Sequence, residues 1–210
     1  RLLAGSLGTL GVLAEVTLKV LPVPVAEQTL VFSMGEAEAI ARLNAWGAQP
    51  LPVSASFWFA DQLWLRLSGA RAAVDAACRK LGGEPMDATV NPKKHWISVR
   101  EQTHPAFAGT PLWRLSLPST TAPLELGVPQ ANEWGGAQRW LAGDLDPDEV
   151  RRAAAAAGGH AVLYRAAESL RCRVGAFAPL SPALHALHRR LKKTFDPKGI
   201  LNPGRLYAEF

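Results

Sequence analysis

The order of hydrophobic periodicities between residues 28 and 81 constrains the fold more than any other feature of the sequence. A period of two indicates a strand, and a period of three to four indicates a helix. The segment reads strand, helix, strand, strand, helix, over residues 28–32, 36–46, 55–59, 63–67 and 70–81. Asp61-Gln62 separates the middle two strands and suits a hairpin. This order is most of a ferredoxin-like unit, in which helices pack on an antiparallel sheet.

The second half of the chain contains elements of the same kinds. Asn91-Pro92, Asp146-Pro147 and Ser181-Pro182 each place a capping side chain before a proline at the first helical position. The predicted helices run over 92–101, 147–157 and 182–195, and the predicted strands run over 112–117, near Leu124, over 138–141 and over 160–165. We therefore expect an α+β fold, with two antiparallel sheets and helices packed on them.

A further strand is predicted near the N-terminus. Over residues 12–20 the even positions are apolar, while Glu15 and Lys19 fall on odd positions, which is typical of a strand with one face buried. Pro22 and Pro24 end this strand, because proline cannot donate a ladder hydrogen bond, and we place a domain junction there. The chain begins with Arg in the middle of a pattern, so we expect it to be the later part of a longer protein.

The net charge of +5 is local, because residues 185–205 contain six Lys or Arg and one Asp while the rest is balanced. All seven Trp lie outside this basic stretch, whereas nucleic-acid binding usually interleaves aromatic and basic side chains. We therefore expect no binding of nucleic acid. No run of roughly 18 apolar residues occurs, so we predict no transmembrane segment either.

Cysteine and histidine usage gives no sign of a metal or disulfide framework. Cys78, which we expect to be buried, and Cys172 form neither a CxxC pair nor a dense pattern, which favours a reducing compartment. His185 and His188 have a spacing that two metal ligands can adopt, but no carboxylate or cysteine accompanies them. We predict no metal site.

Three evenly spaced glycines, Gly5, Gly8 and Gly11, precede the first predicted strand. Glycine allows a backbone to approach a flat or charged ligand closely. A dinucleotide-binding fingerprint needs a helix after its glycines, whereas a strand follows here, so a glycine-rich turn is the simpler interpretation. Asn202-Pro203-Gly204 is likewise a turn by composition.

Arg114 is a charge inside an apolar strand, between Trp113 and Leu115. Turned inward, its guanidinium could hold a carboxylate through two parallel hydrogen bonds. Turned outward, it would lie on the solvent face of a sheet. The residues alone leave both orientations open.

Several stretches together resemble one family. Residues 5–22 (GSLGTLGVLAEVTLKVLP) resemble the closing strand of the FAD-binding domain in flavoproteins of the vanillyl-alcohol-oxidase type, and residues 191–205 (LKKTFDPKGILNPGR) are similar to that family's C-terminal signature. Between them, residues 111–118 (PLWRLSLP), 134–141 (WGGAQRWL) and 175–180 (GAFAPL) are similar to the FAD-binding subunits of bacterial glycolate oxidases. The resemblance covers nearly the whole chain.

The resemblance implies an FAD protein in a multi-subunit complex that oxidises glycolate, a small 2-hydroxy acid, to glyoxylate. A second FAD subunit and an iron–sulfur subunit are the implied partners. It also implies that Ser6, Gly8, Gly11 and Val12 line the FAD with backbone and small side chains, and that Asn202 approaches the flavin ring.

The resemblance divides the chain into three parts. Residues 1–24 are the closing strand of the FAD-binding domain, residues 25–180 are a ferredoxin-like cap domain, and residues 181–210 are a helix and tail that return to the FAD-binding domain. The family's pyrophosphate-binding loops have no counterpart in this sequence. We therefore expect FAD in the intact protein, but neither stoichiometric FAD nor activity in this chain alone.

In the implied reaction, hydride passes from the hydroxyl-bearing carbon to the flavin, a base takes the hydroxyl proton and an arginine holds the carboxylate. Arg114 and His160 are the residues that we offer for these roles. Two alternatives stay open, a non-catalytic assembly subunit that docks the catalytic FAD subunit and a basic binding module that uses the C-terminal helix. We expect a cytoplasmic protein that reaches the inner membrane only as a peripheral part of its complex.

Overall fold

The computed structural model describes residues 2–87 and 90–209, which divide into two compact units. The first, which we call the sheet unit, comprises residues 22–168. The second, which we call the terminal unit, combines the residues up to 21 with those from 169 onward. Among the described residues, no helix has both the length and the apolar character that crossing a membrane requires.

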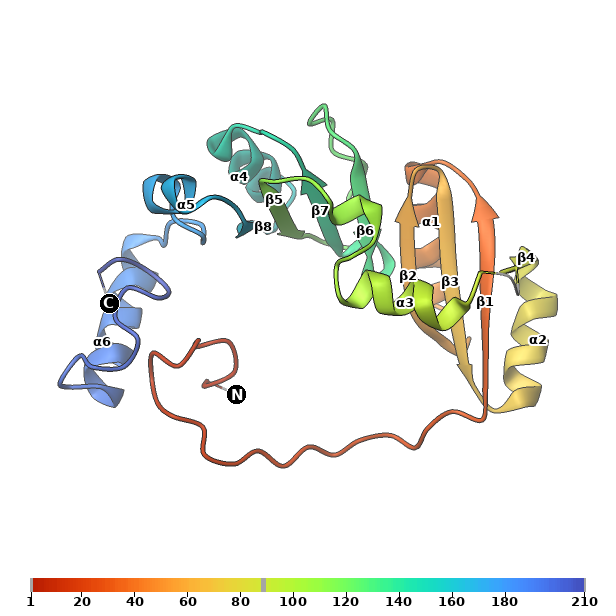
Figure 1. The fold of residues 1–210 in the computed structure, drawn as a ribbon, viewed down its shortest axis with the longest axis horizontal. Coiled ribbons are helices and arrows are strands. Elements are labelled where there is room, and N and C mark those ends of the chain that lie inside the picture. The colour runs from red at the N-terminus through yellow and green to blue at the C-terminus, as the bar shows by residue number, and fades with distance from the viewer. Residues whose placement is uncertain (1, 88–89, 210) are drawn as a thin grey trace. The chain divides into compact units, whose positions relative to one another are not determined.

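A single sheet of eight strands forms the sheet unit, in the order β4-β1-β3-β2-β6-β7-β5-β8, with antiparallel pairing throughout (Figure 1). The strands are β1 (Ala26–Ser33), β2 (Val53–Phe59), β3 (Gln62–Gly69), β4 (Glu84–Pro85), β5 (Leu112–Ser116), β6 (Gln130–Glu133), β7 (Gln138–Ala142) and β8 (His160–Arg165). The helices between them are α1 (Glu36–Gly47), α2 (Arg71–Leu81), α3 (Pro92–Arg100) and α4 (Pro147–Ala156), with short 3₁₀ turns η1 (Pro105–Phe107) and η2 (Trp134–Gly136). The α+β class and the antiparallel pairing predicted from the sequence are confirmed.

Alternate side chains of each strand divide the sheet into two faces. One face, the helical face, buries Leu30, Leu65 and Trp113 against α1, α2 and α4. The other, the open face, carries Phe57 and Trp140, which pack with residues of α3 and η1. Figure 1 shows α3 in front of the strands and α1 behind β2 and β3. Apolar side chains are therefore buried on both faces, under α1, α2 and α4 on the helical face and under α3 and η1 on the open face.

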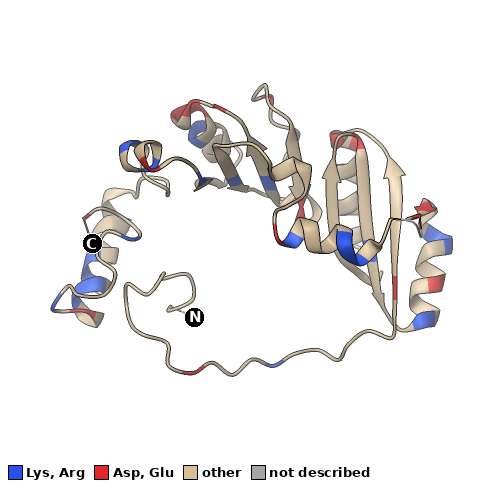
Figure 2. Cartoon of the chain, in the orientation of Figure 1, with Lys and Arg blue, Asp and Glu red and all other residues tan. Residues whose placement is uncertain are grey.

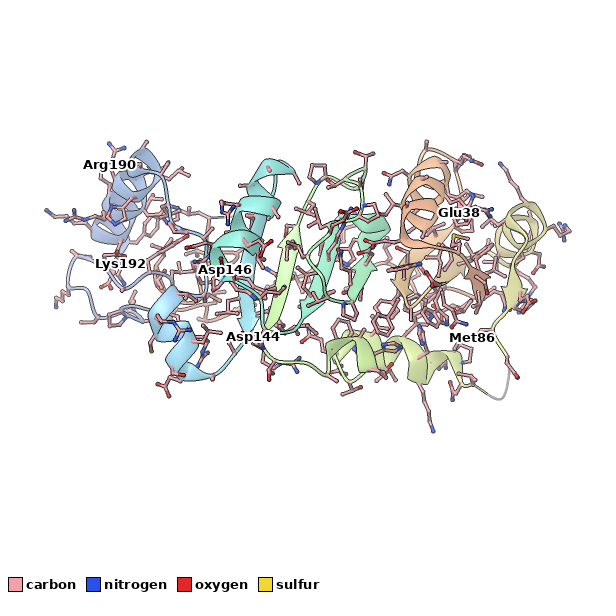
Figure 3. All side chains as sticks on the ribbon, turned by 90° about the horizontal axis from the view of Figure 1, so that it is seen from above. Glu38, Met86, Asp144, Asp146, Arg190 and Lys192 are labelled. Atoms are coloured by element: carbon pink, nitrogen blue, oxygen red, sulfur yellow. The ribbon has the colours of Figure 1, made fainter. Side chains whose placement is uncertain are left out.

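The predicted helix starts are confirmed by their caps. The Asn91 side chain accepts from the Lys93 backbone N–H at 3.0 Å, and the Asp146 side chain, labelled in Figure 3, accepts from the Asp148 N–H at 3.0 Å. Each cap satisfies a backbone donor that lacks a partner within its helix. The hairpin between β2 and β3 also forms, although its two left-handed residues are Ala60 and Asp61, one position earlier than predicted.

Two predictions about the sheet are wrong. The strands form one sheet and not two, because β2 pairs with β6 and joins the halves. No strand forms near Leu124, and the strand of that region is β6, which sequence reasoning missed. Its residues Gln130 and Asn132 are polar but buried, and Asn132 donates to the Glu36 carboxylate at 3.0 Å. A polar strand whose hydrogen bonds are supplied by distant elements shows no hydrophobic alternation.

The strand predicted over residues 12–20 is also absent. Val12 is 83% exposed and Val20 79% exposed, and no described strand pairs with this segment. Alternation sets which side chains share a face, but a strand also needs a neighbour for its backbone N–H and C=O groups.

Cys78, which was expected to be buried, is half-buried, because Ala77 and Val74 occupy the buried side of α2.

Two histidines lie in the aromatic cluster of the open face. The ring centroids of His95 and His104 are 5.7 Å apart, and both rings contact Phe57 and Trp64 edge-on or tilted. Burial lowers the pKa of His95 to about 4, helped by the nearby His104, and burial also lowers the pKa of His104. Both rings are therefore neutral at pH 7.

We expect the free energy of unfolding of the protein to fall as the pH drops from about 6.5 to about 4. In this window the unfolded chain binds protons at His95 and His104 that the folded cluster excludes, so acid favours the unfolded state. Urea denaturation at a series of pH values measures the effect, and His95→Phe should flatten it. An unchanged slope in His95→Phe would show that other groups cause the pH dependence.

Candidate functional site

The register of β5 brings together the two residues offered for catalysis. Arg114 lies opposite Trp140 of β7, and Ser116, two residues on, lies opposite both Gln138 of β7 and His160 of β8. Because alternate side chains share a face, Arg114, Ser116, Gln138 and His160 all lie on the open face. His160 is exposed, and Arg114, Ser116 and Gln138 are half-buried. We call this set the polar patch.

Arg114 lies neither fully inward nor fully outward. Its guanidinium carbon is 5.6 Å from the centroid of the Tyr164 ring, and that ring stands at 90° to Trp140 at 5.0 Å. Its Nε is buried and has no hydrogen-bond partner among the residues that the structure describes. A buried charged donor without an acceptor costs free energy, so this nitrogen is a place where an anionic ligand would be stabilised.

Glu133 fixes the β6 end of the polar patch. Its carboxylate accepts from Trp140 Nε1 at 2.6 Å and from Gln138 Nε2 at 3.0 Å. The bond from Trp140 holds the indole against which Tyr164 packs, and so supports the stack under Arg114. Sequence reasoning missed Glu133, Gln138 and Tyr164, because only the strand register places them beside Arg114.

The terminal unit brings together three of the five residues predicted to contact the cofactor. Ser6 is buried in the glycine turn and donates through Oγ to the Leu3 carbonyl at 3.0 Å. Asn202 donates through Nδ2 to the Leu7 carbonyl at 2.7 Å, next to Gly8. A Cβ at Gly8 would lie 2.7 Å from that same nitrogen, so glycine is needed for the close approach.

The other two predicted cofactor residues lie apart from this contact. Gly11 is half-buried, and a Cβ there would meet only a leucine side chain at 3.9 Å. Val12 begins the extended exposed segment.

Lys192 links the glycine turn to the C-terminal tail through hydrogen bonds. It lies on α6 (Pro182–Phe195), the second helix of the terminal half after α5 (Glu168–Val174), and is labelled in Figure 3. Its buried ammonium donates to the carbonyls of Thr9 and Leu201 at 2.9 and 2.5 Å and to the Asp196 carboxylate at 2.8 Å. The hydrogen bond from Lys192, together with the Leu201 and Ile200 backbone N–H donors, lowers the pKa of Asp196 to about 2. Sequence reasoning placed Lys192 within the basic stretch of residues 185–205 and did not predict its burial; Figure 2 shows the basic side of α6 in blue.

The described residues fit one edge of a flavin site and not a whole one. The glycine turn and the Asn202 loop form a fixed backbone surface, but the Ser6 and Asn202 donors are already used within the chain. The cavity beside the turn measures about 240 Å³, below the usual range for sites of drug-sized ligands. No cluster of His, Cys, Asp or Glu suited to a metal occurs in the described part of the chain.

Comparison with known proteins supports the resemblance seen in the sequence. Residues 178–206 match the family described as FAD linked oxidases, C-terminal domain. The chain is 43% identical over 211 aligned positions to the glycolate oxidase subunit GlcE of Escherichia coli (strain K12). That alignment covers 100% of this chain and 57% of the relative, so the chain spans little more than half the length of the curated protein that it matches. The predicted resemblance to FAD-linked oxidases and glycolate oxidase subunits is confirmed.

Proposed function

Since the chain is similar to FAD-linked oxidases and, along its whole length, to a glycolate oxidase subunit, we propose that it is part of the FAD-binding subunit of a glycolate oxidase complex. The intact protein would oxidise glycolate to glyoxylate. FAD, when bound to the intact protein, supplies the hydride acceptor. The single observation that carries the proposal is the 43% identity across the whole chain.

The polar patch supports a role in holding a small 2-hydroxy acid. The unpartnered Nε of Arg114 can donate to one carboxylate oxygen, and the terminal nitrogens of the same guanidinium can donate to the other. The Tyr164 ring lies under the guanidinium, 5.6 Å from its central carbon, and contributes a cation–π contact. His160 pairs with Ser116, two residues after Arg114 on β5. It is the candidate for accepting the hydroxyl proton.

The glycine turn supports a role in bounding the cofactor. Gly5, Leu7 and Gly8 all have left-handed backbone conformations, and Asn202 holds the Leu7 carbonyl. A flat ring could approach this backbone closely because the turn projects few side chains. The pyrophosphate needs converging N–H donors, which this edge does not offer, so its binding falls to other parts of the intact protein.

We also propose the partners and the location that accompany this function. The complex would contain a second FAD subunit and an iron–sulfur subunit. The protein would be cytoplasmic and would reach the inner membrane only through the complex. The basic α6 would dock other parts of the assembly and not nucleic acid, since among the described residues all Trp lie outside it.

Arg114→Ala in the intact protein should raise the KM for glycolate about 10- to 100-fold with little change in kcat. A charge-assisted hydrogen-bonded pair contributes about 1.5–3 kcal/mol, and a carboxylate clamp binds substrate and transition state alike. Steady-state kinetics of the assembled complex measures both constants. Arg152→Ala, an exposed arginine on α4, is the matched control and should leave both unchanged. An unchanged KM in Arg114→Ala would remove Arg114 from substrate binding.

A further inference from the structure

Trp140 of β7 is buried on the open face and lies opposite Arg114 in the strand register. Its ring stands at 86° to Phe107 and at 90° to Tyr164, with centroid distances of 5.4 and 5.0 Å. The Tyr164 ring in turn lies 5.6 Å from the guanidinium carbon of Arg114. A continuous series of contacts therefore joins the buried indole to the arginine of the candidate carboxylate site.

The hydrogen bond to Glu133 fixes the orientation of this indole. An indole has a single donor, Nε1, so its bond to the Glu133 carboxylate at 2.6 Å determines which edge of the Trp140 ring faces β6. Edge-to-face contacts depend on that orientation, because they bring the positive edge of one ring against the negative face of the other. Rotation of the indole would therefore weaken its contact with Tyr164.

Trp113 of β5 provides a comparison within the same sheet. It lies on the helical face and is 0% exposed, yet its Nε1 has no hydrogen-bond partner in the part of the chain that the structure describes. Burial of an indole in this sheet therefore does not by itself require an acceptor. Trp140 has an acceptor, and a charged one, which forms a stronger hydrogen bond than a neutral group. Glu133 is thus an additional constraint on Trp140 and not a condition of its burial.

Glu133 is itself held in place by the sheet. It is half-buried, and it pairs with Gln138 in the register of β6 and β7. Gln138 donates to its carboxylate through Nε2 at 3.0 Å. This second bond keeps the carboxylate at one position, so the indole orients toward a fixed acceptor.

We propose that Glu133 is a positioning residue for glycolate binding, which acts on Arg114 through the two rings between them. The inference rests on the proposed function, because it needs Arg114 to hold the substrate carboxylate. Without the hydrogen bond, the rings would adopt several orientations, and a smaller fraction of molecules would present the guanidinium correctly. The apparent affinity for the substrate falls in proportion to that fraction. The chemical step, once the substrate is bound, would be unchanged.

The first test measures steady-state kinetics of the assembled complex with variants of the full-length protein. Glu133→Ala and Trp140→Phe each remove the hydrogen bond, and each should raise the KM for glycolate about 3- to 10-fold with kcat unchanged. Glu133→Gln keeps an acceptor for the indole N–H, so its KM should stay within about twofold of that of the unaltered protein. Glu149→Ala, which removes an exposed carboxylate of α4, is the matched control and should change neither constant.

A double-mutant cycle separates positioning of Arg114 from a general loss of structure. Because Glu133 acts through Arg114, Glu133→Ala should raise the KM no further in an Arg114→Ala background. The inhibition constant of acetate, a carboxylate with no hydroxyl to oxidise, should rise in Glu133→Ala by the same factor as the KM. A lower kcat with an unchanged KM, or effects of the two substitutions that multiply, would overturn the inference. Trp140→Phe keeps an aromatic ring in the core, so it provides the same test if Glu133→Ala does not fold.

Arg114→Ala alone tests the proposed function on the same samples. If Arg114→Ala raises the KM while Glu133→Ala and Trp140→Phe leave it unchanged, the positioning role is overturned and the proposed function stands. If Arg114→Ala leaves the KM unchanged, Arg114 does not hold the carboxylate, and the positioning role of Glu133 is overturned with it.

Discussion

Arg139→Met should lower the free energy of unfolding of the protein by about 3–5 kcal/mol. Arg139 is 0% exposed, on the helical face of β7. Its guanidinium donates to the carbonyls of Gly136 at 3.2 Å, Ala122 at 2.7 Å and Thr121. The substitution would leave those three carbonyls without a donor and remove the cation that lies 3.7 Å from the half-buried Glu36. Breaking a buried network costs more than the net contribution of its bonds.

Urea denaturation followed by circular dichroism measures this loss. Arg152→Met makes the same chemical change at an exposed position of α4, and we expect it to alter the free energy by less than about 0.5 kcal/mol. Losses of equal size in the two variants would mean that the Arg139 network contributes nothing specific. Asn132 also donates to Glu36, so Arg139→Met and Asn132→Ala should combine non-additively.

Lys192→Met should release the glycine turn from the C-terminal tail. The ammonium is the donor shared by the Thr9 carbonyl, the Leu201 carbonyl and the Asp196 carboxylate. Methionine fills similar space but donates nothing, so these buried acceptors lose their partner. Asp196 keeps its two backbone N–H donors, so the loss falls on the Thr9 and Leu201 carbonyls, and two carbonyls without this donor correspond to about a 100-fold increase in local opening. Hydrogen exchange at the Thr9 amide, which donates to the Ser6 carbonyl in the folded turn, reports that opening.

Lys193→Met provides the control for this prediction, because Lys193 is the next residue of the same helix and is exposed. Exchange at Thr9 should be unchanged in that variant. If Lys192→Met also left the exchange rate unchanged, the turn would be held by Asn202 and by its own backbone bonds instead. In the intact protein, the same substitution should weaken FAD binding if the turn bounds the cofactor.

The sequence predicted the elements whose signals are local. The caps at Asn91 and Asp146 and the β2–β3 hairpin depend on residues a few positions apart, and each formed near the expected position. Strand β6 was missed because Gln130 and Asn132 are buried polar residues whose hydrogen bonds go to the Leu124 carbonyl and the Glu36 carboxylate, outside the strand. The strand expected over 12–20 failed for the opposite reason, since its pattern is local but no described strand lies beside it to pair with its backbone.

The same difference between local and long-range signals applies to the candidate site. Arg114 was identifiable as a charge within an apolar strand, but its proximity to His160 depends on the register between β5 and β8, which no single segment encodes. Gly8 and Asn202 were expected at the cofactor, and the structure brings them together. Lys192 and Arg139 were not singled out, because a buried cation satisfied by backbone carbonyls has the same sequence signature as an exposed one.

Anaerobic titration of the intact, FAD-loaded protein with glycolate tests most directly whether this chain belongs to a subunit that carries out the oxidation. We predict that the flavin absorbance of this subunit bleaches with one equivalent of glycolate, and that Arg114→Ala shifts the bleaching to higher glycolate concentrations while Arg152→Ala does not. A flavin that stays oxidised in this subunit, while the flavin of its partner is reduced, would contradict the proposal. That result would instead favour a non-catalytic subunit that docks the catalytic one.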